Sequence, residues 1–117
     1  MSEDALRFLP LKASHFHILL AVANGPAHGY GIRQSVDERT GGAIVLAAGT
    51  LYETLQRLQR RGLVEETVPP EVAPEGASSR WRFYRATELG RRVLQLDVER
   101  LERDVASARD LLSAESG

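Results

Sequence analysis

Residues 48–61 constrain the fold most, because they combine an apolar stripe at helical spacing with a defined stop. Leu51, Leu55 and Leu58 are spaced four and three residues apart, so they lie on one face of a helix. Gly62 follows directly, and glycine tolerates the left-handed conformation just past a helix C-terminus. We therefore expect a helix here that buries one face in a core.

The opposite face of this helix carries polar groups of the kinds that contact DNA. Its members are Thr50, Glu53, Gln56, Arg57 and Arg60. Hydroxyl, amide and guanidinium groups reach phosphates and base edges in a major groove, and arginine either pairs with guanine or clamps a phosphate. A buried stripe backed by such a face favours a DNA recognition helix, although a solvated helix face has a similar composition.

The remaining segments predict the order helix, helix, short strand, helix, strand, loop, strand, helix, which is that of a winged helix-turn-helix. The expected elements besides the recognition helix are helices at 13–24 and 29–40, a short strand at 44–46, strands at 63–68 and 80–85 around a proline-rich loop at 69–79, and a helix at 88–112. We expect a mainly α fold with a small β-hairpin wing and a long C-terminal dimerisation helix. Its parts are an N-terminal arm at 1–10, the winged domain at 11–87, and the dimerisation helix with a short tail at 88–117.

The last helix carries an apolar heptad pattern. Its members, spaced alternately four and three residues apart, are Leu94, Val98, Leu101, Val105, Ala108 and Leu112. At 1.5 Å per residue this helix is roughly 37 Å long, which exceeds what so small a core requires. We therefore expect a homodimer that sets two recognition helices about 34 Å apart. A helix that packs only on its own domain is the alternative.

Charge is distributed unevenly along a chain whose formal net charge is −1. Residues 80–92 hold five arginines against one glutamate, whereas residues 95–117 hold six acids against three arginines. The local field rather than the total steers a nucleic acid. Arg80 and Arg82 are therefore expected to contact the backbone of an adjacent minor groove, with ordinary cross-strand solvation as the alternative.

Composition excludes several classes of function. The chain has no cysteine, which rules out disulfides, thiolate metal sites and cysteine nucleophiles. His15 and His17 point in different directions around a helix and cannot bind one metal ion together. We also see no nucleophile beside a general base and no glycine-rich phosphate loop. We expect no enzyme activity, no metal and no cofactor.

The sequence also indicates where the protein works. No apolar run approaches the roughly 20 residues that span a bilayer, and no signal peptide is visible at the N-terminus. We therefore expect a soluble cytoplasmic protein without a membrane partner.

Four motifs, in order, resemble those of the PadR family, named for a regulator of phenolic acid decarboxylase. The motifs are Phe16-His17-Ile18-Leu19-Leu20, His28-Gly29-Tyr30-Gly31-Ile32, Gly49-Thr50-Leu51-Tyr52 with Gly62-Leu63-Val64-Glu65 after it, and Tyr84-Arg85-Ala86-Thr87-Glu88-Leu89-Gly90. The match covers about residues 9–112. The resemblance implies a dimeric bacterial transcription factor, usually a repressor, of the short subfamily with a single C-terminal helix.

The residues expected to contact double-stranded operator DNA are His28, Tyr30, Gly49, Thr50, Tyr52, Glu53, Gln56, Arg57, Arg60, Arg80 and Arg82. His28 either caps the second helix or touches a phosphate, and Tyr52 either packs on the core or reaches a phosphate. The position before the recognition helix is Ala47 or Ala48, where the family usually has a capping serine or similar residue. An N–H group is thereby left for a phosphate or water to satisfy.

A small-molecule effector is a further expectation. Some short PadR-like proteins bind flat drugs between their C-terminal helices on an aromatic residue there. This chain has no aromatic residue in 88–117, which disfavours such a stacked site, but Phe8 and Phe16 remain candidates to line one. Trp81 either packs or offers a platform for a ligand.

Two functions from different classes remain open. The first is a dimeric repressor of a near-palindromic operator, released by a small molecule or by a change at the dimer interface. The second is a winged-helix protein-interaction module that no longer binds DNA, favoured by the near-neutral net charge and by Glu53 on the recognition face. MarR-like and ArsR-like regulators need extra helices or metal ligands that this chain lacks.

Overall fold

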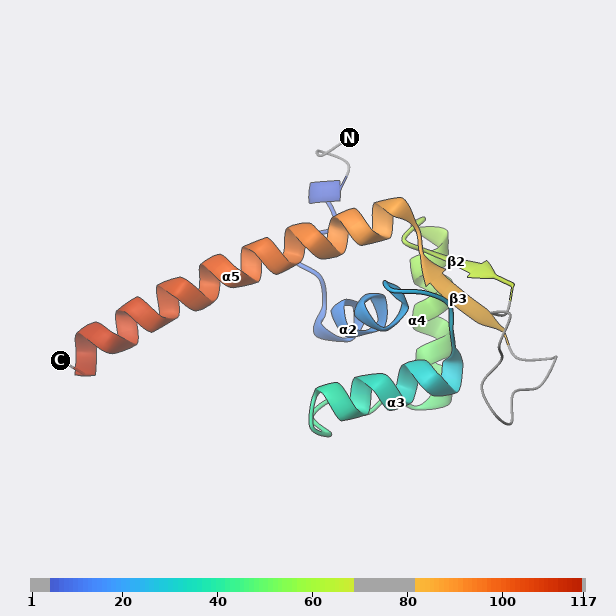
Figure 1. Cartoon of the computed structure of the whole chain (residues 1–117), viewed down its shortest axis with the longest axis horizontal. Coiled ribbons are helices and arrows are strands. Elements are labelled where there is room, and N and C mark those ends of the chain that lie inside the picture. Colours follow the sequence, from blue (N-terminus) through green and yellow to red (C-terminus); the bar gives the residue numbers. More distant parts are fainter. Residues whose placement is uncertain (1–4, 69–81, 117) are drawn as a thin grey trace.

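Helices surround a small sheet in the part of the chain that the computed structural model describes, residues 5–68 and 82–116 (Figure 1). The elements in chain order are α2 (Ala13–Val22), β1 (Ala27–His28), α3 (Gly29–Arg39), α4 (Ala48–Arg60), β2 (Val64–Thr67), β3 (Phe83–Ala86) and α5 (Glu88–Ser116). The far half of α5 projects away from the other elements, so the molecule measures 58 Å along its longest axis but only 25 Å along its shortest. The architecture is the expected winged helix-turn-helix with a long C-terminal helix.

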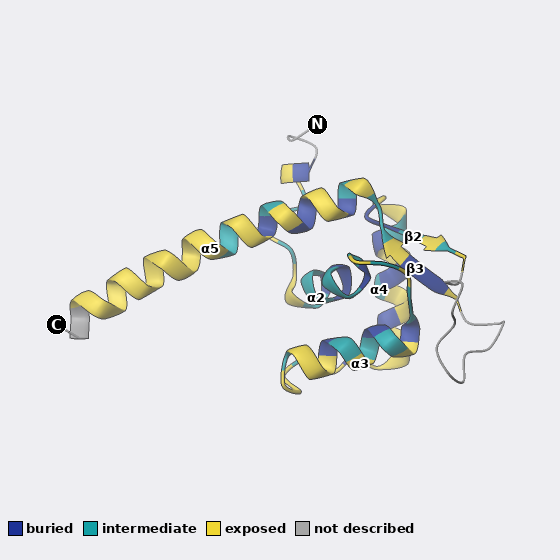
Figure 2. Ribbon diagram, viewed as in Figure 1, coloured by how far each residue is buried: buried dark blue, intermediate teal, exposed yellow. Residues whose placement is uncertain are grey.

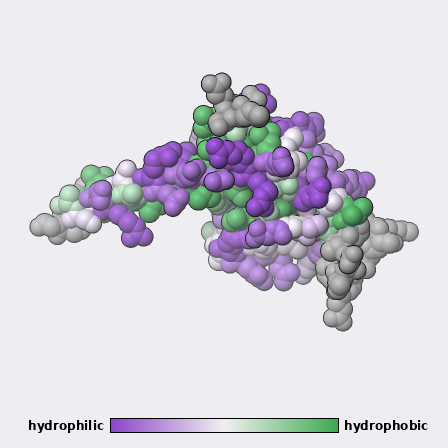
Figure 3. Space-filling view, turned by 45° about the horizontal axis from the view of Figure 1, so that its top comes forward, coloured by the Kyte–Doolittle hydropathy of each residue, from purple (hydrophilic) through white to green (hydrophobic). Residues whose placement is uncertain are grey.

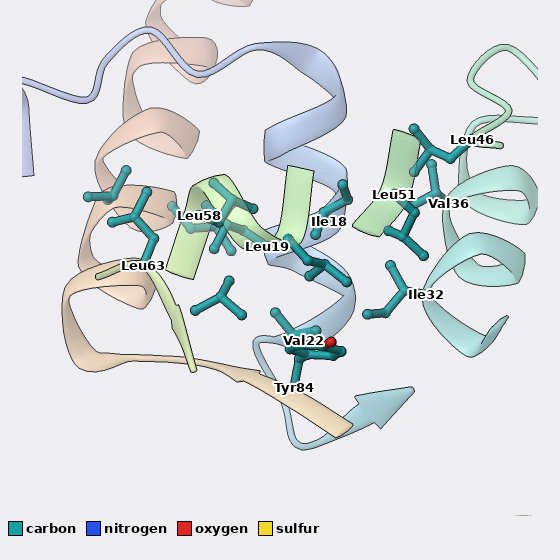
Figure 4. Packing of buried hydrophobic residues seen from close by; sticks show 14 of the residues in the cluster. Ile18, Leu19, Val22, Ile32, Val36, Leu46, Leu51, Leu58, Leu63 and Tyr84 are labelled. Atoms are coloured by element: carbon teal, nitrogen blue, oxygen red, sulfur yellow. The ribbon is translucent and has the colours of Figure 1, made fainter. Parts of the chain in front are cut away.

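The core forms where α2, α3 and α4 bring their apolar faces together (Figure 4). The predicted stripe Leu51, Leu55 and Leu58 is fully buried there. Ile18 and Leu19 of α2 belong to the same cluster, together with residues of α3, β2, β3 and α5. Full burial of one such leucine stabilises the fold by about 1.5–3 kcal/mol, so this stripe fixes α4 with its polar face outward.

The sheet differs from the sequence expectation in one strand. Its order is β1-β3-β2, with antiparallel pairs throughout. The predicted strand at 44–46 is wrong, since that run is irregular and β1 takes the place beside β3 instead. Side chains hold the run's backbone: the Thr40 hydroxyl accepts from the Ile44 N–H at 3.1 Å, and Arg33 Nε donates to the Leu46 carbonyl at 2.7 Å.

The ends of the elements follow the local chemistry that the sequence suggests. Gly62 has a φ of 78°, which confirms the left-handed stop after α4. The Thr87 hydroxyl accepts from the Gly90 N–H at 3.0 Å and so caps α5, as predicted. α2 ends at Val22, two residues before its predicted end, while α5 continues to Ser116, four residues past its own.

Parts of two predictions lie outside the described residues. The loop at 69–79, Arg80 and Trp81 are not described, so the wing is seen only as β2 and β3. In the N-terminal arm, residues 5–8 form a turn in which the Phe8 N–H donates to the Ala5 carbonyl at 3.2 Å, and Ala5 is buried in the core. Among the described helices, none is both long and apolar enough to cross a membrane.

Candidate nucleic-acid interface

The outer face of α4 is built as the sequence predicts. Glu53, Gln56, Arg57 and Arg60 are all exposed, on the side opposite the three buried leucines (Figure 2). Within the described part of the chain, neither arginine has an ion-pair partner. Their guanidinium groups are therefore available to an external anion or base edge.

The first turn of α4 lacks a capping side chain. Ala47 is the N-cap, with an extended backbone and no side-chain hydrogen bond to the helix. Gly49 and Thr50 follow it and are exposed. The free N–H groups of a first turn carry partial positive charge, which favours an anion there. This is the arrangement expected of a site that receives a phosphate.

Tyr52 leaves the outer face and turns toward the first turn of α3. A Cβ built on Gly29 would lie 2.5 Å from the Tyr52 hydroxyl oxygen, so the ring occupies the space that a side chain would need. Tyr52 nonetheless keeps 44% of its surface exposed. The structure therefore shows a packing role for Tyr52, whose hydroxyl end lies against Gly29 while part of the residue stays exposed.

His28 caps α3 and arranges the residues around it. Its Nδ1 accepts from the Gly31 N–H at 3.0 Å. Its ring stacks against Tyr30, with 6.4 Å between centroids, and meets the edge of Phe83. Burial lowers the pKa of His28, which favours the neutral ring that such an acceptor requires. Of the two residues, Tyr30 is the more accessible, with 63% of its surface exposed.

The described part of the wing places one predicted arginine at the surface. Arg82 is exposed, and its Nε lies 3.7 Å from a carboxylate oxygen of Glu66. Arg85 forms a shorter pair with Glu65 at 2.7 Å. Exposed ion pairs of this kind contribute about 0–1 kcal/mol to stability. The longer Arg82–Glu66 pair therefore costs little to exchange for a contact with an external anion.

Two features near α4 have no counterpart in the sequence prediction. Arg33 holds the loop that leads into α4 through its bond to Leu46, and an isolated arginine on a helix gives no signal of that role. His15 is buried, and its pKa is lowered by burial first and then by Lys12, Arg61 and Arg57. The start of α2 and the C-terminal end of α4 thus form one basic region, and cations so far apart in the sequence give no signal that they meet.

The heptad residues of α5 divide between the protomer's core and its surface. Leu94 is only 7% exposed and belongs to the core, so the exposed part of the predicted seam begins at Val98. Val105, Ala108 and Leu112 are exposed on the projecting half (Figure 2). Hydrophobic residues are visible along that half in Figure 3. We call Val98, Leu101, Val105, Ala108 and Leu112 the exposed seam.

A hollow of about 510 Å³ adjoins the exposed seam near α2. It is lined by Phe16, Val98, Leu101, Glu102, Val105, Ala106 and Arg109. In the described residues, no three histidine, aspartate or glutamate side chains come together as metal ligands.

Residues 18–96, more than half of the chain, match the family described as transcriptional regulator PadR-like. The transcriptional regulator Rv3488 of Mycobacterium tuberculosis is 36% identical over 111 residues, which cover 95% of this chain and 94% of that protein. An uncharacterised 37.1 kDa protein in transposon TN4556 of Streptomyces fradiae is 31% identical over 86 residues, but this chain spans only 22% of its length.

Solved structures show the same fold. A PadR family transcription regulator from Clostridium difficile R20291 superposes with a TM-score of 0.69 at 22% identity, covering 86% of this chain and 99% of that chain. Bacillus subtilis PadR in complex with operator DNA superposes with a TM-score of 0.58 at 21% identity, covering 74% of this chain and 45% of that chain. The chain therefore belongs to the PadR-like family, whose members are transcriptional regulators and not enzymes.

Proposed function

We propose that this chain is a cytoplasmic, dimeric repressor that binds operator DNA through α4. The observation that carries the proposal is the pair Arg57 and Arg60, exposed and without ion-pair partners in the described chain, opposite three fully buried leucines. Such a helix enters a major groove with its polar face toward the bases. Bacillus subtilis PadR, which shares the fold, has been solved in complex with operator DNA.

Different residues of the proposed site contact different parts of the DNA. Gln56, Arg57 and Arg60 face the bases and the adjoining phosphates, and Glu53 accepts from cytosine or rejects a wrong register. The uncapped first turn of α4, with Gly49 and Thr50, receives a phosphate. Tyr30 and His28, at the start of α3, contact the backbone of the same DNA strand as the first turn of α4. Arg82, with Arg80, reaches the neighbouring minor groove.

Fluorescence anisotropy with duplexes from the gene's own upstream region tests the proposal. Wild-type protein is expected to bind one segment specifically, with an affinity that falls steeply as salt rises, because phosphate contacts release counterions. Arg57→Glu should weaken binding at least about tenfold, since it turns a contact into a repulsion. Arg103→Glu is the charge-matched control, because Arg103 is exposed on α5, away from the proposed site. Binding that is absent at low salt, or indifferent to sequence, contradicts the proposal.

A second copy of the chain is the proposed occupant of the exposed seam. The seam combines a heptad pattern with apolar residues that are exposed at Val98, Val105, Ala108 and Leu112 and half-buried at Leu101. Two such helices bury these residues against each other and set the two copies of α4 on one face of the duplex.

We also propose that the effector binds in the hollow between Phe16 and the exposed seam, whose Val98, Leu101 and Val105 line it and are shared with the dimer contact. The wall of the hollow is mainly apolar and includes the Phe16 ring and the cationic Arg109, which suits a flat aromatic anion. The dye 1-anilinonaphthalene-8-sulfonate is a suitable probe. Phe16→Ala should weaken its binding severalfold, whereas Phe8→Ala, outside the lining, should not. Equal effects of the two substitutions contradict this assignment.

The competing function is a protein-interaction module without DNA binding. The net charge of −1 and the exposed Glu53 on the outer face of α4 favour it. It predicts that the protein is not retained on heparin and co-purifies with a protein partner, whereas the repressor is retained and released by salt.

A further inference from the structure

α5 begins directly against the C-terminal end of α4. The Thr87 hydroxyl donates to the Gly62 carbonyl at 2.5 Å and accepts from the Gly90 N–H at 3.0 Å. The Thr87 backbone N–H donates to the Leu63 carbonyl at 3.1 Å. One threonine therefore ties the stop of α4 to the first turn of α5, and we call these four residues the α4–α5 joint.

Gly90 allows the two segments to approach this closely. A Cβ built on Gly90 would overlap the carbonyl oxygen of Leu63. Gly90 is not in the left-handed region, so the need for glycine here is steric rather than conformational. Any larger residue must push α5 away from the end of α4, because a backbone carbonyl cannot swing aside as a flexible side chain can.

A second contact, on α2, holds the start of α5 from another direction. The Arg91 guanidinium donates to the Ala23 carbonyl, just past the end of α2. Val93 and Leu94 then pack into the core on the next turn. These contacts hold the first turns of α5, and its far half then projects away from the domain (Figure 1).

We infer that Thr87 and Gly90 are positioning residues that set the angle between α4 and α5, and through it the operator spacing that the dimer accepts. The inference rests on the proposed function. Val105, in the exposed seam, lies about 27 Å along α5 from Thr87 at 1.5 Å per residue. A tilt of about 10° at the joint moves that point by about 5 Å, more than the roughly 3.4 Å rise of one base pair. A tilt of this size at the joint is therefore enough to alter the half-site spacing that the dimer accepts.

Operator duplexes with altered half-site spacing test the inference. The half-sites are first mapped by footprinting on the upstream region, and the spacing is then shortened or lengthened in single base pairs. Wild-type protein should prefer one spacing by about tenfold or more, and Thr87→Ser, which keeps the hydroxyl, should keep that preference. Thr87→Val removes both hydroxyl bonds and should reduce the preference at least about threefold or move the optimum. Ile18→Val, in the core of α2, controls for a general loss of stability.

A distance measurement tests the joint without DNA. The chain has no cysteine, so spin labels can be placed on Ala48→Cys in α4 and Ser107→Cys in α5 without background labelling. Diluting the doubly labelled chain with unlabelled protein leaves one labelled chain per assembly. Thr87→Val, and Gly90→Ala if circular dichroism shows it folded, should shift or broaden the distance distribution relative to Thr87→Ser.

The two measurements separate failure of the inference from failure of the proposed function. If wild-type protein binds no duplex of any spacing, the proposed function fails, while the label distances still report whether the joint fixes α5. If wild-type protein discriminates spacing, and Thr87→Val shows the same discrimination and the same distances, the inference is overturned.

Discussion

At the residue scale, Gly29 shows how two sequence motifs depend on each other. The ring of Tyr52 occupies the space beside the Gly29 backbone, so no side chain fits there without moving the ring. We predict that Gly29→Ala lowers the free energy of unfolding by about 1–3 kcal/mol, the usual cost of overpacking. It should also weaken DNA binding, because displaced Tyr52 carries the first turn of α4 with it. Urea denaturation and operator titration check the two effects.

Gly49 supplies the matched control for this prediction. It also lies in the first turn of a helix, but nothing lies within 4 Å of a Cβ built on it. Gly49→Ala should therefore raise stability by up to about 1 kcal/mol, as expected for alanine against glycine in a helix. Tyr52→Ala removes the ring that the new methyl group would meet. In that background, Gly29→Ala should cost less stability than it does in the wild-type protein. Strict additivity would show that the two residues do not interact.

His15 predicts how stability depends on pH. Burial, and then the cations Lys12, Arg61 and Arg57, lower its pKa from 6.5, so the folded protein holds the ring neutral. As pH falls through about 6.5 the unfolded chain takes up the proton first, and the free energy of unfolding therefore decreases below that pH. Above about pH 6.5 this group contributes no slope.

Denaturation of wild-type protein and His15→Gln at about pH 7 and about pH 5 measures this contribution. The variant should lose less stability on acidification than wild-type protein, because glutamine does not titrate. Ile18→Val should keep the wild-type slope, since it removes no titrating group. An unchanged slope in His15→Gln would show that the buried ring does not couple folding to pH.

Single residues differ in how far the sequence could specify them. Gly62 and Thr87 were predictable, because a left-handed stop and a helix cap depend on the few residues next to them. The Gly29–Tyr52 contact and the burial of His15 were not, since each brings together segments that are distant in sequence.

At the element scale, the first turn of α4 lacks a cap that would stabilise the helix but would also block the proposed phosphate site. Ala47 offers no side-chain acceptor to the first turn. We predict that Ala47→Asp raises the free energy of unfolding by about 0.5–2 kcal/mol, as an N-cap does, and weakens operator binding. The carboxylate would occupy the place proposed for a phosphate and repel it. Denaturation and anisotropy on the same variant should move in opposite directions.

Lys12 at the start of α2 is the control for that prediction. It is also an N-cap residue without a side-chain bond to its helix. Lys12→Ser installs a cap and changes the net charge by the same single unit as Ala47→Asp. It should gain stability with a much smaller loss of operator affinity. Equal losses in the two variants would place the phosphate elsewhere.

Elements with a strong local pattern were predicted, and those without one were not. The leucine stripe and the glycine after it predicted the C-terminal end of α4 to within one residue. The prediction of a strand at 44–46 was wrong because side chains outside the run hold its backbone. Arg33 of α3 and Thr40, the C-cap of α3, make these bonds, and this tertiary effect outweighs local propensity. The two-residue strand β1 is too short to show any alternation.

At the scale of the whole molecule, the order of the elements was predictable and the division of α5 was not. The helical and strand patterns of the segments predicted the winged helix-turn-helix, because each pattern is local to its own segment, and the four motifs then indicated the family. The heptad pattern treated Leu94 and Val98 as equivalent, whereas the first is buried in the core and the second is exposed. Only the packed structure shows where α5 leaves the domain.

The exposed seam predicts the oligomeric state. Val105 lies in the middle of the projecting half of α5, with 50% of its surface exposed. A charge at the centre of an apolar helix pair is costly to bury, so Val105→Glu should convert a dimer into a monomer in sedimentation velocity. Operator affinity should fall at least about tenfold, because each half-site is then bound separately.

Ser107→Glu adds the same charge two residues away, on the opposite side of α5, and should leave both the dimer and operator binding intact. Circular dichroism should show both variants equally helical, because positions 105 and 107 are both exposed on α5. Wild-type protein that sediments as a monomer, or a Val105→Glu variant that remains dimeric, would mean that the heptad pattern serves another partner. Two copies of α4 would then have no fixed separation, and recognition of a palindromic operator would need a different interface.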